Sequence, residues 1–274
     1  MRLIQISDTH HSVEHKDFAA NCEVIAAAVA ARKPDLIINT GDISMNGCIC
    51  APDIELARSW HQALGVPVLS VPGNHDVGDR PEIRADQVID NARINAFNAF
   101  AGADRWTHDL PGWRFIGLNA MLFKTGHEQE EAQFEWLRKA VETDAKLAIF
   151  MHKPLFIDSI DEGARGYWTV YPEPRRRLLD IIASRDVRLV ASGHLHIARE
   201  LTVGNTTHIW GPASSFVSGD SQEDLGGERR IGFVEYNFDE TGFSHAFVFP
   251  EGATPLLIDE VGSRIYPKPA SKPA

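Results

Sequence analysis

Apolar runs and amphipathic stretches alternate along most of the chain. Leu36-Ile37-Ile38 is an unbroken apolar run of the kind that forms a buried strand, whereas Val24, Ile25 and Ala28 recur at helical spacing. The apolar runs predict strands at 3–6, 36–38, 66–71, 113–118, 147–151 and 187–191. The amphipathic stretches predict helices at 18–31, 53–64, 81–101, 128–142 and 174–184.

After Ser192-Gly193-His194 the helical pattern stops, and only strands are expected, at 199–203, 208–210, 231–238 and 243–249. Strands separated by helices favour parallel βαβ units and an α/β fold. The chain shows no internal repeat and no linker. We therefore expect one domain over residues 1–266, followed by a flexible tail at 267–274 that is rich in proline and lysine.

Composition and charge exclude several classes of protein. The chain has 274 residues of which 43% are hydrophobic, enough for a full core, and its formal net charge of −11 argues against a coat for nucleic acid. No apolar run approaches the roughly 18 residues of a membrane span, and Asp8 comes too early for a signal peptide. Cys22, Cys48 and Cys50 are interpreted as reduced thiols, so we expect a cytoplasmic protein.

Chemically active side chains follow the predicted strands at the points where those strands end. Five segments share this position: Asp8-Thr9-His10, Gly41-Asp42, Gly73-Asn74-His75-Asp76, His152 and Gly193-His194-Leu195-His196. The carboxyl ends of strands are where open α/β sheets place their ligands. Each residue alone would pass for a turn, cap or core residue, but the ordered set predicts one common site.

The donor set favours divalent metals. Carboxylate, imidazole and amide groups without thiolates suit Mn, Fe or Zn, and their number fits two ions. We expect Asp8 and His10, and likewise His194 and His196, to alternate on extended backbone and so to point to one side. Asp42 is expected to bridge two ions through its two oxygens. The glycines are expected to allow sharp turns at the strand ends.

The ordered pattern D-x-H, G-D, G-N-H-D, H and G-H-x-H resembles the calcineurin-like metallophosphoesterase superfamily. By size the chain is similar to the class III cyclic-nucleotide phosphodiesterases and bacterial glycerophosphodiesterases within it. The resemblance implies a four-layer αββα sandwich, in which two mixed β-sheets are flanked by helices and a binuclear metal site lies at the strand C-terminal ends. It implies a first metal held by Asp8, His10, Asp42 and His196, and a second held by Asp42, Asn74, His152 and His194.

The same resemblance assigns catalytic roles. It implies that His75 is the catalytic histidine near the leaving group and that Asp76 orients it. The expected activity is hydrolysis of a small phosphodiester through a metal-bridging hydroxide. A phosphomonoesterase with the same site and a non-catalytic metal-binding scaffold are the alternatives. Two cations in an acidic chain give a locally positive site, which favours a small phosphate ester over a long nucleic acid. A homo-oligomer is compatible with the resemblance.

Other features leave alternatives open. Lys153 either adds positive charge near the site or faces solvent, and the run Arg175-Arg176-Arg177 fits a solvated helix face better than a phosphate-binding patch. The long segment from Phe156 to Pro172 carries Trp168 and Tyr171 and is a candidate substrate lid.

Overall fold

The first of two β-sheets contains the amino-terminal strand at its centre. The computed structural model describes residues 1–220 and 225–265, and the expected tail at 267–274 lies outside them. The strand order is β11-β10-β1-β2-β3, in which β1, β2 and β3 run parallel and β10 pairs antiparallel with both β1 and β11. The bounds are β1 Arg2–Ile6, β2 Leu36–Asn39, β3 Val68–Ser70, β10 Phe233–Phe238 and β11 Phe243–Val248.

The second sheet has the order β4-β5-β6-β7-β9-β8. Its four central strands are parallel, and the edge strands β4 and β8 are antiparallel to their neighbours. The bounds are β4 Trp106–Leu110, β5 Trp113–Leu118, β6 Lys146–Met151, β7 Val187–Ser192, β8 Arg199–Val203 and β9 Thr206–Trp210.

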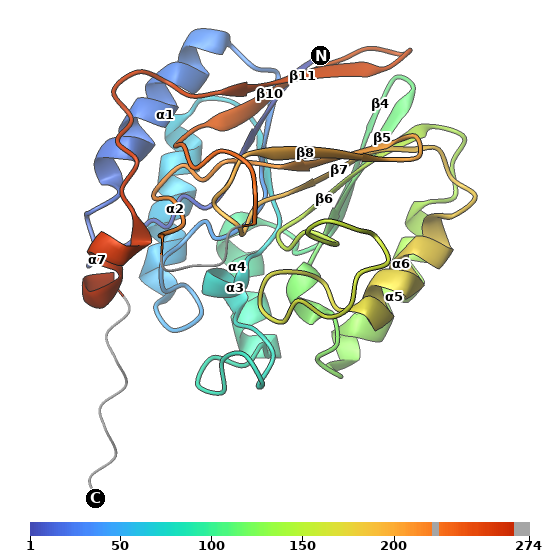
Figure 1. Ribbon diagram of the computed structural model, residues 1–274, viewed down its shortest axis with the longest axis horizontal. Helices are drawn as coiled ribbons and strands as arrows, with labels where there is room; N and C mark the ends of the chain where they lie inside the picture. Colours follow the sequence, from blue (N-terminus) through green and yellow to red (C-terminus); the bar gives the residue numbers. More distant parts are fainter. Residues whose placement is uncertain (221–224, 266–274) are drawn as a thin grey trace, which may run out of the picture.

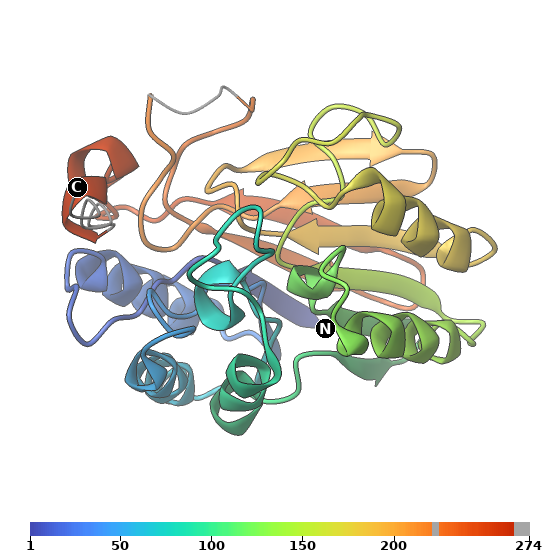
Figure 2. The ribbon, with the colours of Figure 1, turned by 90° about the horizontal axis from the view of Figure 1, so that it is seen from below.

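Helices cover the outer faces of both sheets (Figures 1 and 2). Helices α1 (Ala19–Arg32) and α2 (Ala51–Ala63) pack on the first sheet through a cluster that includes Ile25 and Ile37. Helices α5 (Glu128–Ala140) and α6 (Pro172–Ile182) pack on the second sheet through Leu137, Leu178 and Ile149. A third apolar cluster lies between the sheets, so the expected αββα sandwich with two mixed sheets is confirmed.

A buried amide crosses the apolar layer between the sheets. Gln5 in β1 donates from Nε2 to the Ser192 carbonyl at the end of β7, at 2.9 Å, and to Thr40 Oγ1 at 3.1 Å. Its Oε1 accepts the hydroxyl of Tyr236 in β10, at 2.7 Å. These bonds satisfy the amide and fix the ends of β1, β2 and β7 relative to one another.

The structure corrects several expected elements. The helix expected at 81–101 is only α4 (Asn91–Ala101), because the Asp90 side chain caps it by accepting from Arg93 N while the preceding residues form turns. The edge strand β4 was not expected. Short helical segments α3 (Asn74–Val77) and η1 (Ala120–Leu122) were not expected either.

The expectation that no helix follows His194 is wrong. Helix α7 (Ile258–Ile265) packs beside the start of α1 (Figures 1 and 2). Its Val261 and Ile265 are buried with Phe18 and Phe216, and this contact stabilises a short helix. Within residues 1–220 and 225–265, no helix combines the length and the apolar character needed to cross a membrane.

Candidate metal centre

The five segments meet where the parallel strands of both sheets end. Asp8 and His10 follow β1, Asp42 follows β2, and Asn74 begins α3 just after β3. From the second sheet, His152 follows β6, whereas His194 and His196 follow β7. All the predicted ligand side chains are buried. The site therefore lies across the carboxyl-terminal edges of the two sheets.

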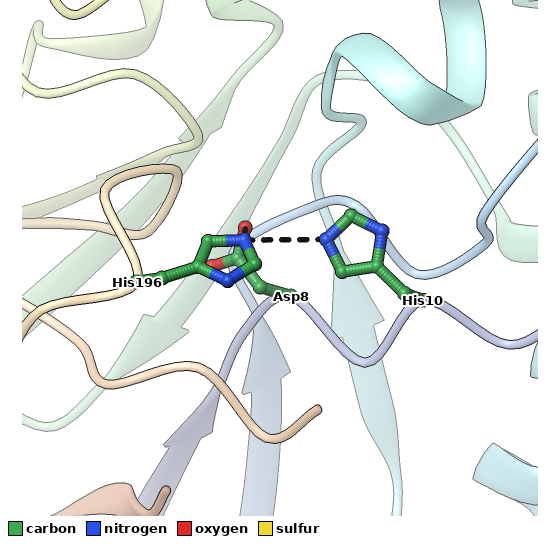
Figure 3. Close-up of side chains that lie close together, drawn as sticks. All are labelled: Asp8, His10 and His196. Atoms are coloured by element: carbon green, nitrogen blue, oxygen red, sulfur yellow. Dashed lines mark hydrogen bonds and ion pairs between the residues drawn. The ribbon is translucent and has the colours of Figure 1, made fainter. Parts of the chain in front are cut away.

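One cluster of ligand atoms joins Asp8, His10 and His196 (Figure 3). His196 Nε2 lies 3.3 Å from His10 Nε2 and 3.2 Å from Asp8 Oδ1. A second cluster joins Asp42, His152 and His194. In it, His152 Nε2 lies 3.2 Å from Asp42 Oδ2 and 3.2 Å from His194 Nδ1. Ring nitrogens that converge in this way on buried carboxylates form a donor set suited to a divalent cation.

Asp42 connects the two clusters through one oxygen. Its Oδ2 faces His152 of the second cluster and lies 3.8 Å from His10 Nε2 of the first. Its Oδ1 accepts the backbone N–H of His75 at 2.8 Å. We expected both oxygens to face ions, but Oδ1 is engaged by the backbone and Oδ2 alone faces both clusters. A ligand atom of His75 also lies within 4.8 Å of those of His10 and Asp42.

Backbone carbonyls fix the orientation of four histidine rings. The bonds are His196 Nδ1 to Phe216 O at 2.7 Å, His152 Nδ1 to Thr40 O at 2.8 Å, His75 Nδ1 to Met45 O at 2.6 Å and His194 Nε2 to Tyr167 O at 3.0 Å. A carbonyl oxygen only accepts, so the ring nitrogen facing it carries the proton in the neutral tautomer. In that tautomer the other nitrogen, which faces the site, carries the lone pair with which an imidazole binds a metal.

The backbone at the site is left-handed, not extended. The φ angles of Asp8, His10, Asp42, His194 and His196 are 52°, 47°, 49°, 72° and 54°. The expected strand-like alternation is therefore wrong for both D-x-H and H-x-H. L-residues adopt this conformation at a cost, and such residues cluster at functional sites. Here the surrounding hydrogen bonds of the loops hold the ligands in it.

Glycines permit close approach of these loops. A Cβ atom at Gly193 would lie 1.8 Å from Ser7 Oγ and 2.6 Å from Asp8 Oδ2, which excludes any side chain. Gly41, with a φ of 101°, is the residue that serves the sharp turn expected from the sequence. At Gly193, in contrast, glycine is needed because the loop after β7 lies so close to the loop after β1 that no Cβ atom fits between them.

Asp76 has a different partner from the one expected. The orienting bond of His75 goes to the Met45 carbonyl, whereas the Asp76 carboxylate accepts the backbone N–H groups of Ile43, Ser44 and Gly73 and the Ser44 hydroxyl. Asp76 thus joins the loop after β2 to the loop after β3. Burial and the neighbouring Asp42 raise the pKa of Asp76 to about 7, against the effect of these donors.

Electrostatics at the site favour a bound cation. Burial raises the pKa of Asp42, but the imidazoles of His152 and His75 outweigh it and hold that pKa well below its usual range. Burial lowers the pKa of His152, yet Asp42 raises it to about 9, so a proton lies between them. Burial lowers the pKa of both His10 and His194, which leaves those rings neutral. A cation at this position would take over the neutralising role of the proton.

Asn74 supplies a further donor that fits a metal. Within the described residues its Oδ1 is buried and makes no hydrogen bond. A buried carbonyl oxygen without a partner is costly, and coordination would satisfy it. The donors present, namely carboxylates, imidazoles and this amide, thus fit the divalent metals expected from the sequence.

The comparison with known families agrees with this geometry. The family model described as Calcineurin-like phosphoesterase matches residues 1–198. The chain belongs to this family. The predicted resemblance and the predicted class of enzyme, a phosphoric ester hydrolase, are confirmed at the level of the family.

Relatives of this phosphoesterase extend along most of its length. A protein named probable cyclic nucleotide phosphodiesterase, from Synechococcus sp., is 28% identical over 226 residues, which cover 78% of this chain and 81% of that protein. One named probable glycerophosphodiester phosphodiesterase, from Arcobacter nitrofigilis, is 27% identical over 212 residues, 72% of each. The crystal structure of a dimetal phosphatase from Danio rerio shares the fold, with a TM-score of 0.61, 14% identity and coverage of 92% of this chain and 99% of that one.

A cavity of about 130 Å³ opens beside the ligands of the phosphoesterase. Its lining includes Tyr167, Trp168, Phe216, Ser218 and Ile258, which come from three segments distant in sequence. Of these, only Trp168 had been singled out, as part of a candidate lid. The others belong to no motif and carry no local signal, because the fold alone brings them to the site.

The structure decides two expectations about basic residues of the phosphoesterase. Lys153 is buried and its Nζ lies 2.6 Å from Asp79 Oδ2, so it does not face solvent. It adds positive charge near the site, the other alternative, since burial, His152 and Lys153 together lower the pKa of His194. Arg175 is also buried and donates to the carbonyls of Leu155 and Glu162. For Arg175, the expected solvated helix face is wrong. Both residues serve internal contacts of the loops.

Proposed function

We propose that this chain is a binuclear-metal phosphodiesterase that hydrolyses a small phosphodiester. Asp8, His10, Asp42 and His196 would hold one ion, and Asp42, Asn74, His152 and His194 the other. The observation that carries this proposal is the position of Asp42 Oδ2 between His10 and His152, one residue from each cluster. A shared carboxylate oxygen of this kind suits a pair of neighbouring cations.

The metal chemistry follows from the donors. Bound Mn, Fe or Zn ions would polarise the phosphoryl oxygens and lower the pKa of a water molecule. The protein's own part is to hold the donors rigidly: carbonyls fix the histidine rings, and Asp76 fixes the loops that carry Asp42 and Asn74.

His75 is the proposed catalytic residue. Its Nδ1 donates to the Met45 carbonyl, so Nε2 is directed to the side of the ring opposite that bond. His10 is its close neighbour, with ring centroids 4.7 Å apart. A protonated Nε2 in this position would stabilise the phosphoryl oxygens or donate its proton to the departing alkoxide. Asp76 contributes indirectly, by binding the backbone of the loop that leads to Met45.

A small substrate fits the site better than a polymer. The cavity of about 130 Å³ is enclosed in part by Tyr167, Trp168 and Phe216, and the chain carries a formal net charge of −11. Positive charge would be confined to the metals, which attracts a compact phosphate ester. Two relatives that match most of the chain are named for small phosphodiesters.

Three free thiols support a cytoplasmic location.

A comparison of two substrates tests the activity. The protein loaded with Mn, Fe or Zn is assayed with bis(p-nitrophenyl) phosphate and with p-nitrophenyl phosphate, and metal content is measured in the same samples. We expect the diester to have the higher kcat/KM. Faster turnover of the monoester would instead show a phosphomonoesterase. Two bound ions without turnover of either ester or of a panel of small natural diesters would show a metal-binding scaffold.

A further inference from the structure

Tyr167 contacts the second cluster from the later part of the loop that begins with His152, itself a proposed ligand of that cluster. The loop connects β6 to α6, and the Tyr167 carbonyl accepts from His194 Nε2 at 3.0 Å. The Tyr167 ring packs on the same imidazole, with ring centroids 4.5 Å apart. His194 Nδ1, on the other side of its ring, faces His152 Nε2 at 3.2 Å. The carbonyl thus decides which nitrogen of His194 is presented to the cluster.

The side chain of Tyr167 also contacts Asn74. Asn74 Nδ2 approaches the Tyr167 hydroxyl at 3.5 Å, a long contact, and this places the amide nitrogen toward the loop. The Asn74 Oδ1 atom is the buried oxygen that makes no hydrogen bond within the described residues. One residue therefore contacts two of the proposed ligands of the same ion, and in both it contacts the atom that would not bind metal.

Buried cations hold this loop in place. Arg80 Nη2 donates to the Gly166 carbonyl, next to Tyr167, at 3.3 Å, and the Arg80 guanidinium lies 3.7 Å from the centre of the Tyr171 ring. Lys153, paired with Asp79, lies 5.2 Å from the centre of the Tyr167 ring. Asp79 and Arg80 follow α3 and so couple the loop to the segment that carries Asn74. These contacts of Arg80 and Lys153 indicate that the loop is held in a fixed position over the second cluster. Tyr171 takes part in one of them, through its ring.

We propose that Tyr167 is a positioning residue for the second metal of the centre, acting through His194 and Asn74. This inference rests on the proposed function, because it assigns Tyr167 to one ion of the pair. The carbonyl keeps the His194 tautomer in which Nδ1 carries the lone pair, while the ring stops the imidazole from turning. Partners of this kind typically change metal affinity about 10- to 100-fold when lost.

Metal titration of the purified protein tests the assignment. Wild type and Tyr167→Ala are titrated with Mn after chelation, and the dissociation constants of the two ions are compared. We expect Tyr167→Ala to weaken one ion about 10- to 100-fold and to leave the other close to wild type. The electron paramagnetic resonance signal of a coupled Mn pair should be lost in the variant at Mn concentrations that fill the wild type.

Two control variants separate positioning from packing. Ile160→Ala truncates another side chain of the same loop, which packs on the apolar cluster that includes Leu178 and Val190, and it should leave both Mn affinities near wild type. Both variants keep the backbone carbonyl, but Tyr167→Phe also keeps the ring on His194 and loses only the long hydroxyl contact with Asn74, so it should change affinity far less than Tyr167→Ala. If Tyr167→Ala does not fold, Arg80→Gln removes the loop anchor at Gly166 and should weaken the same single ion.

The outcomes distinguish this inference from the proposed function. Wild type that binds two ions, with both affinities unchanged in Tyr167→Ala, overturns the assignment of Tyr167 alone. Equal weakening of both ions, or the same loss in Ile160→Ala, would also overturn it, because it would indicate general loosening of the loop. Wild type that binds fewer than two ions overturns the binuclear function itself.

Discussion

Asp76 accepts both the hydroxyl and the backbone N–H of Ser44, at 2.6 and 2.9 Å. It also accepts the backbone N–H of Gly73 at 2.8 Å, and so joins the two loops that carry Asp42 and Asn74. In Asp76→Asn an amide N–H would face at least one of these donors. We expect the free energy of unfolding of the metal-free protein to fall by about 2 kcal/mol or more, as measured in urea.

Ser44→Ala is the matched control for this prediction. It removes only the hydroxyl donor, and the expected loss is about 1 kcal/mol. If Asp76→Asn is as stable as Ser44→Ala, the carboxylate does not hold the two loops together.

Asp42→Ala should remove both metals from the centre. Oδ2 of this residue faces both clusters, so its loss deprives each ion of a charged ligand. Elemental analysis after dialysis against trace metal should find less than one ion per chain. Asp109→Ala, which removes an exposed carboxylate paired with Arg114 on the edge of the second sheet, should keep two. Retention of two ions in Asp42→Ala would refute the shared position.

His75→Ala should reduce turnover while metal content stays near wild type. The residue is proposed to act on the phosphoryl group or on the leaving alkoxide, so kcat should fall about 100- to 10,000-fold. Steady-state kinetics and metal analysis on the same preparation check this. A variant that loses an ion along with its activity would reassign His75 as a ligand, a role that its proximity to His10 and Asp42 allows.

Gly193→Ala should disturb the approach of the two sheets. The added Cβ would lie 1.8 Å from Ser7 Oγ, so the loops must separate, at a cost of about 1–3 kcal/mol or more in the free energy of unfolding. Gly163→Ala is the control, because a Cβ there meets nothing within 4 Å. Chemical unfolding of both variants tests this, and equal stabilities would contradict it.

His61 should make stability depend on pH. Burial lowers its pKa from the usual 6.5 to about 3, and Asn39 Nδ2 lies 3.0 Å from its Nε2. Between these values the unfolded chain binds more protons, so the contribution of His61 to stability is complete above pH 6.5 and falls as the pH drops, by up to about 1.4 kcal/mol per pH unit.

Urea unfolding of the metal-free protein at several pH values measures this slope. His208 acts in the same direction, since burial lowers its pKa to about 4, whereas the raised pKa values of Asp76 and His152 act in the opposite direction. The informative quantity is therefore the difference between wild type and His61→Gln. The difference in free energy of unfolding between the two proteins should shrink as the pH falls. A difference that stays constant would show that His61 does not cause the pH dependence of stability.

The strand ends and their polar residues could be predicted because both are local patterns. A run such as 147–151 reads as a buried strand, and His152 follows it directly. Helix α7 could not be predicted in the same way, because its burial depends on Phe18 and Phe216 from distant segments. The short amphipathic pattern alone is too brief to identify a helix.

Side-chain partners at the site were harder to predict than the ligands. Arg175 stands in a run of charge that usually faces solvent, yet it is buried because the carbonyls of a long loop need donors there. Tyr167 carries no motif, and only the tertiary fold places its carbonyl against His194. The left-handed φ of Asp8 and His10 also depends on neighbouring loops, so sequence spacing wrongly suggested extended backbone.

The buried amide of Gln5 has a consequence for how the two sheets are aligned. Apolar side chains between sheets tolerate sliding, since one methyl contact can replace another at little cost. Gln5 does not tolerate sliding of the sheets, because a displacement would break the hydrogen bonds of its buried amide with Ser192, Thr40 and Tyr236. Two sheets with apolar inner faces could stack in many alignments. The hydrogen bonds of Gln5 select the alignment in which the end of β1 lies opposite the end of β7.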